Sequence, residues 1–265
     1  MTNEFPQALS IAGSDSGGGA GMQADLKTMQ MRHVFATTVL VAITAQNTLG
    51  VQDSMPLPKK IIDEQFASLA SDLKIRACKT GMLADIPTVE AVVENLKKYD
   101  FGPLTVDPVM IAKGGAPLLT EDAIETVKNK LIPLADLVTP NLPEAEALTG
   151  MKIETESDMQ EAGKKLQSLG AKNVLVKGGH LSSDDQAADF ALLEDGSSFW
   201  MTSPRYNTVR THGTGDTLSS CITAELAKGV SMENAIRTGK AYVEATIRDG
   251  IEVGHGHGPL NHWAV

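Results

Sequence analysis

The sequence has little cysteine and lacks long apolar or basic runs. Its 2 cysteines, Cys78 and Cys221, lie far apart and neither has a CxxC partner, which argues against a disulfide framework and a structural zinc site. The longest apolar stretch, around residues 34–43, is too short to span a bilayer. The sequence also does not start with a basic segment of the secretory kind, so we expect a cytoplasmic protein with no membrane partner.

The charge balance is acidic, with 33 Asp and Glu against 23 Lys and Arg and a formal net charge of −10. Nucleic-acid-binding proteins normally present a basic face, so we expect no nucleic-acid partner. At 265 residues and 42% hydrophobic content, the chain is long enough for one large α/β core. No internal repeat or low-complexity segment is visible, and we expect residues 1–265 to form one domain.

Strand-like and helix-like segments alternate along the chain. Short apolar runs predict strands at residues 8–12, 35–44, 75–79, 104–106, 137–138 and 173–177. Amphipathic stretches predict helices at residues 22–31, 59–73, 86–98, 121–130 and 157–169. This alternation predicts an α/β fold with a parallel sheet and helices on both faces. Two runs, at residues 187–193 and 198–202, predict a hairpin added to the sheet.

A glycine-bearing loop leads into a helix within residues 209–229. The apolar residues that recur every four positions predict a buried helical stripe: Leu218, Ile222 and Leu226. Gly213, Thr214 and Gly215 therefore lie at the helix N-terminus, where free N–H groups and the helix dipole favour phosphate. Asp216 has two interpretations. It either caps the helix, or it is a base for a substrate hydroxyl beside donors that stabilise a transferred phosphoryl group.

Other polar loops follow the predicted strands. Among the residues in these loops are Gly13, Gln46, Met82, Asp107, Val109, Asn141 and Lys177. In open α/β sheets, ligands bind in the crevice beyond the carboxyl ends of the strands. We therefore expect these loops to converge beside Asp216.

Several of these polar residues have a structural interpretation as well as a functional one. Asn141 and Glu144 suit a hydrated magnesium ion near nucleotide phosphates, but the same residue types cap helices. Lys177 either neutralises phosphate or is solvated. Asp107 either helps to hold the metal or orders its turn.

Met82 and Val109 either flank a flat ring or belong to the core. His212 lies inside the glycine-bearing loop, and we expect it to shape that loop. The histidines near the C-terminus have no Asp or Glu residues beside them, so a metal site there is not favoured: His255, His257 and His262.

Motifs from nearly end to end of the chain resemble the ribokinase-like superfamily, and within it the hydroxymethylpyrimidine and phosphomethylpyrimidine kinases of thiamine biosynthesis. The resemblance is carried by residues 11–27 (IAGSDSGGGAGMQADLK), 45–51 (AQNTLGV), 79–82 (KTGM), 106–110 (VDPVM), 138–145 (VTPNLPEA), 176–180 (VKGGH) and 211–215 (THGTG). It implies a ribokinase-like three-layer α/β/α fold with a central, mostly parallel sheet. The activity implied is phosphoryl transfer from MgATP to 4-amino-5-hydroxymethyl-2-methylpyrimidine and then to its monophosphate, giving the pyrophosphate.

The resemblance also implies a role for each matching residue. The pyrimidine would be surrounded by Gly13, Asp25, Gln46, Met82 and Val109. Magnesium and phosphates would be organised by Asp107, Asn141 and Glu144. ATP would be met by Lys177, Thr211, Gly213, Gly215, Lys240 and Val243, and the anion hole would be formed by Thr211 and residues 213–215. The segment around Lys113 resembles a lid, and the family implies a homodimer.

One departure from the family pattern concerns the base. Many members of this branch resemble this chain except that they carry cysteine at the position of Asp216, whereas the wider ribokinase-like group carries aspartate. A carboxylate is ionised at pH 7 unless strongly perturbed, so it needs no activation to hold the hydroxyl. Pyridoxal and pyridoxine kinases resemble the chain as well, and B6 vitamers are the alternative substrates. The segment 45–50 (AQNTLG) looks more like the pyrimidine branch.

Two other classes of function compete with a kinase. A binding protein without catalysis would not need Asp216 beside an anion hole. A dehydrogenase would use residues 17–21 (GGGAG) as its dinucleotide loop, but their spacing fits GxGxxG poorly. The sequence therefore favours a kinase.

Overall fold

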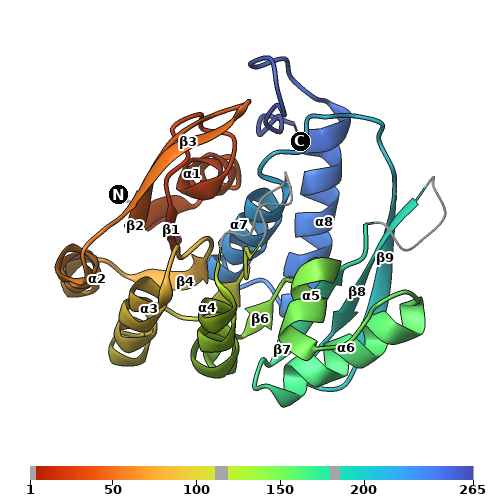
Figure 1. The fold of residues 1–265 in the computed structure, drawn as a ribbon, viewed down its shortest axis with the longest axis horizontal. Helices are drawn as coiled ribbons and strands as arrows, with labels where there is room; N and C mark the ends of the chain where they lie inside the picture. The colour runs from red at the N-terminus through yellow and green to blue at the C-terminus, as the bar shows by residue number, and fades with distance from the viewer. Residues whose placement is uncertain (1–3, 111–118, 180–185, 265) are drawn as a thin grey trace.

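A nine-stranded sheet runs through the structure, a computed structural model that describes residues 4–110, 119–179 and 186–264. The strands lie in the order β3-β2-β1-β4-β5-β6-β7-β8-β9 (Figure 1). Six central strands are parallel: β2 (Phe35–Asn47), β1 (Gln7–Gly13), β4 (Ile75–Thr80), β5 (Leu104–Val106), β6 (Leu137–Val138) and β7 (Asn173–Lys177). The antiparallel strands lie at the edges: β3 (Gly50–Pro56), β8 (Gln186–Leu192) and β9 (Ser198–Pro204). The predicted parallel sheet and hairpin are confirmed.

Helices cover both faces of this sheet. One face carries α2 (Lys59–Asp72), α3 (Ile86–Lys98), α4 (Glu121–Thr126), α5 (Leu142–Thr149) and α6 (Glu156–Ser168). The other face carries α1 (Gly21–Met31), α7 (Thr214–Ala227) and α8 (Met232–Arg248). The three-layer α/β/α architecture is therefore confirmed (Figure 1). In the described part of the chain, no helix is both long enough and apolar enough to cross a membrane.

The boundaries differ from the sequence prediction in three places. The pattern does not predict β3, because all of its residues are exposed and it has no alternation of burial. β2 continues to Asn47, past the predicted end at residue 44, and pairs there with β3. The predicted helix at residues 121–130 is α-helical only over α4 and continues as a π-helical turn, Val127–Leu131.

Successive side chains of β1 and β4 point to opposite faces of the sheet, so neighbouring residues contact different helical layers. Leu9 of β1 packs under α2 to α6, whereas the neighbouring Ser10 faces α1, where its hydroxyl donates to Asp25. In β4, Cys78 packs under α2 to α6, and Lys79 faces α1 and α7. The sequence thus places polar side chains in the layer between the sheet and α7.

The carboxyl ends of the parallel strands meet at one edge of the sheet. β2 lies on one side of β1 and β4 lies on the other, so the strand order reverses at β1. Ligands of open α/β sheets bind at such a reversal. Because α7 packs against β1, β4 and β5, its N-terminus is held beside this point.

Candidate active site

The glycine-bearing loop forms the N-terminus of α7, as the sequence predicts. Gly213 is the N-cap residue with φ of +83°, and a Cβ at this position would overlap the carbonyl oxygen of Gly19. Only glycine fits there. The hydroxyl of Thr214 donates to the carbonyl oxygen of Thr211 at 2.7 Å and closes the turn. Asp216 lies in the first turn of α7, after the N-cap, so the capping interpretation of Asp216 is wrong.

The carboxylate of Asp216 is 16% exposed, so it can meet a ligand. Burial raises its pKa to about 6, against the attraction of Lys79 and a hydrogen bond from the backbone of Gly21. The charges of Asp25 and Asp107 raise the pKa of Asp216 further. A carboxyl with this pKa is largely ionised at pH 7 and close enough to neutrality to take a proton in a transfer step.

A fully buried ion pair lies behind Asp216. The Nζ of Lys79 is 2.7 Å from Oδ1 of Asp25 and 3.7 Å from Oδ1 of Asp216, and the side chains of Lys79 and Asp25 are both 0% exposed. The hydroxyls of Ser10 and Ser220 donate to the two oxygens of Asp25. The structure therefore contradicts the expected contact of Asp25 with a pyrimidine, because this side chain has no exposed surface.

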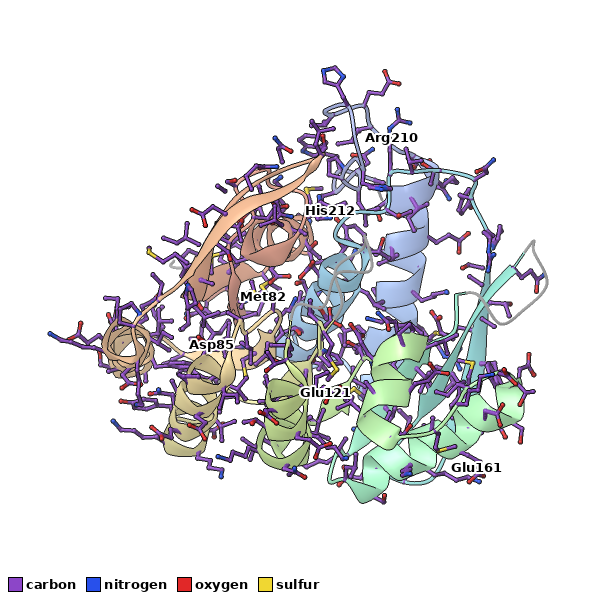
Figure 2. The ribbon with its side chains drawn as sticks, viewed as in Figure 1. Met82, Asp85, Glu121, Glu161, Arg210 and His212 are labelled. Atoms are coloured by element: carbon purple, nitrogen blue, oxygen red, sulfur yellow. The ribbon has the colours of Figure 1, made fainter. Side chains whose placement is uncertain are left out.

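Gly13 and Met82 lie side by side where the strand order reverses. The N–H of Gly13 donates to the carbonyl oxygen of Met82 at 3.1 Å, and a Cβ on Gly13 would lie 2.5 Å from Cε of Met82. The half-buried Met82 thus reaches over the end of β1 (Figure 2). Val109, also half-buried, follows β5 with φ of +27°. Such a φ strains a β-branched residue by about 1–3 kcal/mol, and strain of this kind gathers at ligand sites.

Gln46 is tied to the glycine loop through His212 and Asp15. Nε2 of His212 is 2.9 Å from Oδ2 of Asp15 and 3.3 Å from the side-chain amide of Gln46. A carboxylate only accepts, so Nε2 of His212 carries the proton, and the amide oxygen of Gln46 must be the atom that faces the ring. The amide NH₂ of Gln46 then faces Thr44, which can accept because its own hydroxyl donates to Ser14. This network fixes the orientation of Gln46.

Lys177 and Asp107 form the phosphate side of the site. Nζ of Lys177 is 3.0 Å from Oδ1 of Asp107, and both lie close to Gly215 of the anion loop. Burial alone would lower the pKa of Lys177, but the charges of Asp107 and Glu144 outweigh it and keep the lysine cationic. Among the described residues, Oδ2 of Asp107 is buried and has no hydrogen-bond partner.

Asn141 and Glu144 form a capping box at the start of α5. The Oδ1 of Asn141 accepts from the backbone N–H of Glu144 at 2.9 Å, and Oε2 of Glu144 accepts from the backbone N–H of Asn141 at 2.8 Å. Burial raises the pKa of Glu144, and the charge of Asp107 adds to this effect. The interpretation of this pair as a helix cap is therefore confirmed. It does not exclude a second role, because each oxygen has further acceptor capacity.

On the far side of the loop, α8 carries the other two residues expected near a nucleotide. Nζ of Lys240 is 2.7 Å from Oδ2 of Asp189, whose Oδ1 accepts from the backbone N–H of Gly178. Lys240 is half-buried, and Val243 is 7% exposed and packs mainly against α7. The segment around Lys113 lies outside the described residues.

A sequence profile of the phosphomethylpyrimidine kinase family matches residues 15–261, which is most of the chain and includes all the loops described above except Gly13. The chain belongs to the phosphomethylpyrimidine kinase family. The predicted family and the prediction of a kinase are therefore confirmed.

Individual relatives agree with this assignment. This kinase is 54% identical over 260 residues to the hydroxymethylpyrimidine/phosphomethylpyrimidine kinase of Haemophilus influenzae, with 97% of each chain covered. It is similar to the crystal structure of an ADP complex of Bacillus subtilis pyridoxal kinase, with 36% identity, a TM-score of 0.91 and 98% of each chain covered. It is also similar to the structure of a phosphomethylpyrimidine kinase from Clostridium difficile, with 44% identity and a TM-score of 0.81, over 91% of this chain and 99% of that one.

Sequence reasoning did not assign a role to Lys79 or Asp15. A lysine inside β4, a strand buried on both faces, was the available signal, because a buried lysine requires a charged partner. Asp15 gave no such signal, since aspartate is common in glycine-rich turns. The expectation that His212 shapes the loop is confirmed by its contact with Asp15.

Proposed function

We propose that this kinase transfers the γ-phosphoryl group of ATP to 4-amino-5-hydroxymethyl-2-methylpyrimidine and then to the resulting monophosphate, giving the pyrophosphate. The observation that carries the proposal is the partly exposed carboxylate of Asp216, in the first turn of a helix that begins with a glycine anion loop. The name of the Haemophilus influenzae relative supports the substrate, since the similarity covers 97% of both chains.

In the first transfer, Asp216 accepts the proton of the substrate hydroxyl. The hydroxyl oxygen forms a bond to the γ-phosphorus, the bond from phosphorus to the β-phosphate oxygen breaks, and ADP leaves. The N–H groups of Gly213, Thr214 and Gly215 donate to the oxygens of the transferred group, and Lys177 adds positive charge beside Gly215. Positioning and electrostatic stabilisation of this kind supply most of the catalysis in phosphoryl transfer.

In the second transfer, the acceptor is a phosphate oxygen that carries little or no proton at pH 7. A base is then unnecessary, and the charge of Asp216 would repel the acceptor. The raised pKa of Asp216 reduces this repulsion, because a carboxyl that protonates near pH 6 becomes neutral with little cost. One side chain can therefore serve both transfers.

We infer that magnesium accompanies the nucleotide. In the part of the chain that the structure describes, no group of three or more His, Cys, Asp or Glu side chains could hold a metal ion. Mg²⁺ is usually held by one or two carboxylates together with substrate phosphates. The unpartnered Oδ2 of Asp107 fits this pattern, and Asn141 and Glu144 would act through water. Bound there, the ion would neutralise charge on the phosphates.

For the nucleotide, we propose contacts with Lys177, Thr211, Lys240 and Val243 in addition to the anion loop. The first three are half-buried and can present polar atoms to a ligand. Val243 contributes only a small apolar surface, because most of it packs against α7.

For the pyrimidine, we propose a site formed by Gly13, Gln46, Met82 and Val109. Met82 and Val109 are half-buried side chains that can cover a flat ring. Gln46 offers an amide whose orientation is set by His212. We leave Asp25 out of this group because its side chain has no exposed surface.

Phosphorylation of pyridoxal is the second candidate function. It is favoured by the similarity to the Bacillus subtilis pyridoxal kinase, at a TM-score of 0.91. Both substrates carry a hydroxymethyl group on a flat ring, so the anion loop and Asp216 serve either. The test is a side-by-side measurement of kcat/KM for the pyrimidine alcohol, its monophosphate and pyridoxal by coupled ADP release. Higher kcat/KM for pyridoxal than for the pyrimidine would reverse our ranking.

We also propose that residues 1–265 form one kinase domain that acts as a homodimer. Support for a dimer comes from the end of β2, the edge strand β3 and the turn between them, which expose Ile43, Leu49, Val51 and Met55. Exposed apolar edge strands normally have a partner. Light scattering after size exclusion should give a dimer for the wild type and a monomer for Leu49→Asp. The cytoplasmic location and the absence of a nucleic-acid partner stay predictions.

A further inference from the structure

Lys79 is a lysine with no exposed surface, held in the layer between the sheet and α7. A buried ammonium is costly unless it is paired, so its position requires an explanation. Its Nζ lies between two carboxylates, 2.7 Å from Oδ1 of Asp25 and 3.7 Å from Oδ1 of Asp216. One of these carboxylates is fully buried and the other is partly exposed at the site.

Asp25 is fixed from three directions. Its Oδ2 accepts from the hydroxyl of Ser10 on β1, and its Oδ1 accepts from the hydroxyl of Ser220 on α7 and from Lys79 on β4. A carboxylate held by three hydrogen bonds cannot turn toward a ligand. Its charge instead holds the ammonium of Lys79 in place.

The groups that face Asp216 come from several elements. Lys79 approaches from β4, Asp25 and the backbone N–H of Gly21 from α1, and Asp107 from the segment after β5. Lys79 is the cation in this group, and it opposes the two carboxylates. Gly81, in the loop after β4, borders this group: a Cβ there would lie 3.7 Å from Oδ1 of Asp216 and 3.8 Å from Nζ of Lys79, in ordinary contact with both.

We propose that Lys79, anchored by Asp25, is a positioning residue that holds the carboxylate of Asp216 ionised and directed toward the substrate hydroxyl. This inference rests on the proposed function, in which Asp216 is the base. Lys79 has no exposed surface and acts only through Asp216. Removing it raises the pH at which Asp216 takes up a proton, and removing Asp25 lowers that pH, because Lys79 then has Asp216 as its remaining partner.

The experiment compares Lys79→Met, Asp25→Asn and the double variant with the wild type. Glu225→Gln is the matched control. Glu225 lies on α7 like Asp216, nine residues and roughly 13 Å from it, and the change weakens its ion pair with Arg32 at the end of α1. The first readout is kcat/KM for the pyrimidine alcohol from pH 5 to pH 9 at saturating ATP. Titration of the nucleotide is common to all variants, so the displacement between profiles reports the enzyme.

The second readout needs no substrate. The wild type and each variant are compared with the same protein carrying Asp216→Asn, and the difference in Tm is measured as a function of pH. This difference changes over the pH range in which Asp216 titrates, so its midpoint reports the titration of Asp216. We expect Lys79→Met to move both the acid limb of kcat/KM and this midpoint upward by about 1–3 pH units. We expect Asp25→Asn to move both downward, and Glu225→Gln to lower Tm without moving either.

The opposite directions separate positioning from general loss of stability, which cannot shift a titration both ways. If Lys79→Met does not fold, the double variant is compared with Asp25→Asn, because these two proteins differ only in the lysine and neither buries an unpaired Asp25. The midpoint of the double variant should then lie above that of Asp25→Asn, and equal midpoints would overturn the proposal. Profiles and midpoints that coincide with the wild type in the folded variants would overturn the proposal. A wild type that phosphorylates neither the pyrimidine nor pyridoxal, with midpoints that still shift, would overturn the proposed function and leave the coupling of Lys79 to Asp216 standing.

Discussion

Changing Asp216 to Asn should make the protein more stable and less active. Burial raises the pKa of Asp216 from 3.8 to about 6. The folded state therefore binds the proton more tightly than the unfolded state, and stability is lost as the pH rises from about 4 to about 6. A rise of two pKa units lowers the free energy of unfolding at pH 7 by about 3 kcal/mol. The Asn variant keeps this free energy because its side chain is never ionised. For a chain of this length, that is a rise in Tm of roughly 5–10 °C.

The activity should move the other way, and by different amounts for the two transfers. Loss of a general base costs at least ~100-fold in kcat for the alcohol. The monophosphate has little proton to give up, so its kcat should fall much less. The assays are thermal unfolding from pH 4 to pH 8 and coupled ADP release with each acceptor. An Asp216→Asn protein with a lower Tm than the wild type at pH 8, or with near-normal turnover of the alcohol, would refute the reasoning.

Further predictions concern the loops around the anion site. Gly213→Ala should abolish turnover, because a Cβ there would overlap the carbonyl of Gly19. The control is Gly229→Ala, which has the same φ of +83° but no described atom within 4 Å of the added Cβ and should leave kcat near the wild-type value. Steady-state kinetics of the two variants test this. Asp107→Asn should raise the Mg²⁺ concentration for half-maximal rate on the order of 10-fold without changing KM for the pyrimidine; an equal loss of rate at every Mg²⁺ concentration would contradict it. Asp15→Asn should lower Tm at pH 7. Burial would raise the pKa of Asp15, but hydrogen bonds from His212 and the loop backbone outweigh burial and lower this pKa. The stability that these hydrogen bonds supply is therefore present above about pH 4 and is lost as the pH falls below it. A Tm difference between Asp15→Asn and the wild type that does not shrink on acidification would count against this.

The layers of the fold follow from patterns visible in the sequence, because buried parallel strands read as short apolar runs between amphipathic helices. These patterns do not predict β3. Its residues are exposed, and its place beside β2 depends on pairing rather than on burial. The early end predicted for β2 has the same origin, since Gln46 and Asn47 are polar and are held in the strand by hydrogen bonds to β3.

For the site, the sequence predicts which loops converge but not which polar groups face one another. Glycine spacing and helix periodicity predict that Gly213 and Asp216 lie at the start of a helix, and the structure has them at the start of α7. Lys79 and Asp25 are 54 residues apart, and their charges come to 2.7 Å because α1 packs on β1, the strand that pairs with β4. The role expected for Asp25 failed for this reason: its motif matches the family, but its side chain points into the layer beneath the site.

The charges of the site fall into two groups, each built around a lysine. Lys79 is held by the buried Asp25 and leaves Asp216 partly exposed; Lys177 contacts one oxygen of Asp107 and leaves the other without a described partner. Each group therefore offers one carboxylate oxygen to the ligands while its lysine limits the repulsion between that oxygen and a polyphosphate. Since a base must be ionised when the first transfer begins and a metal-binding oxygen must be ionised to hold the ion, each oxygen benefits from a separate cation behind it.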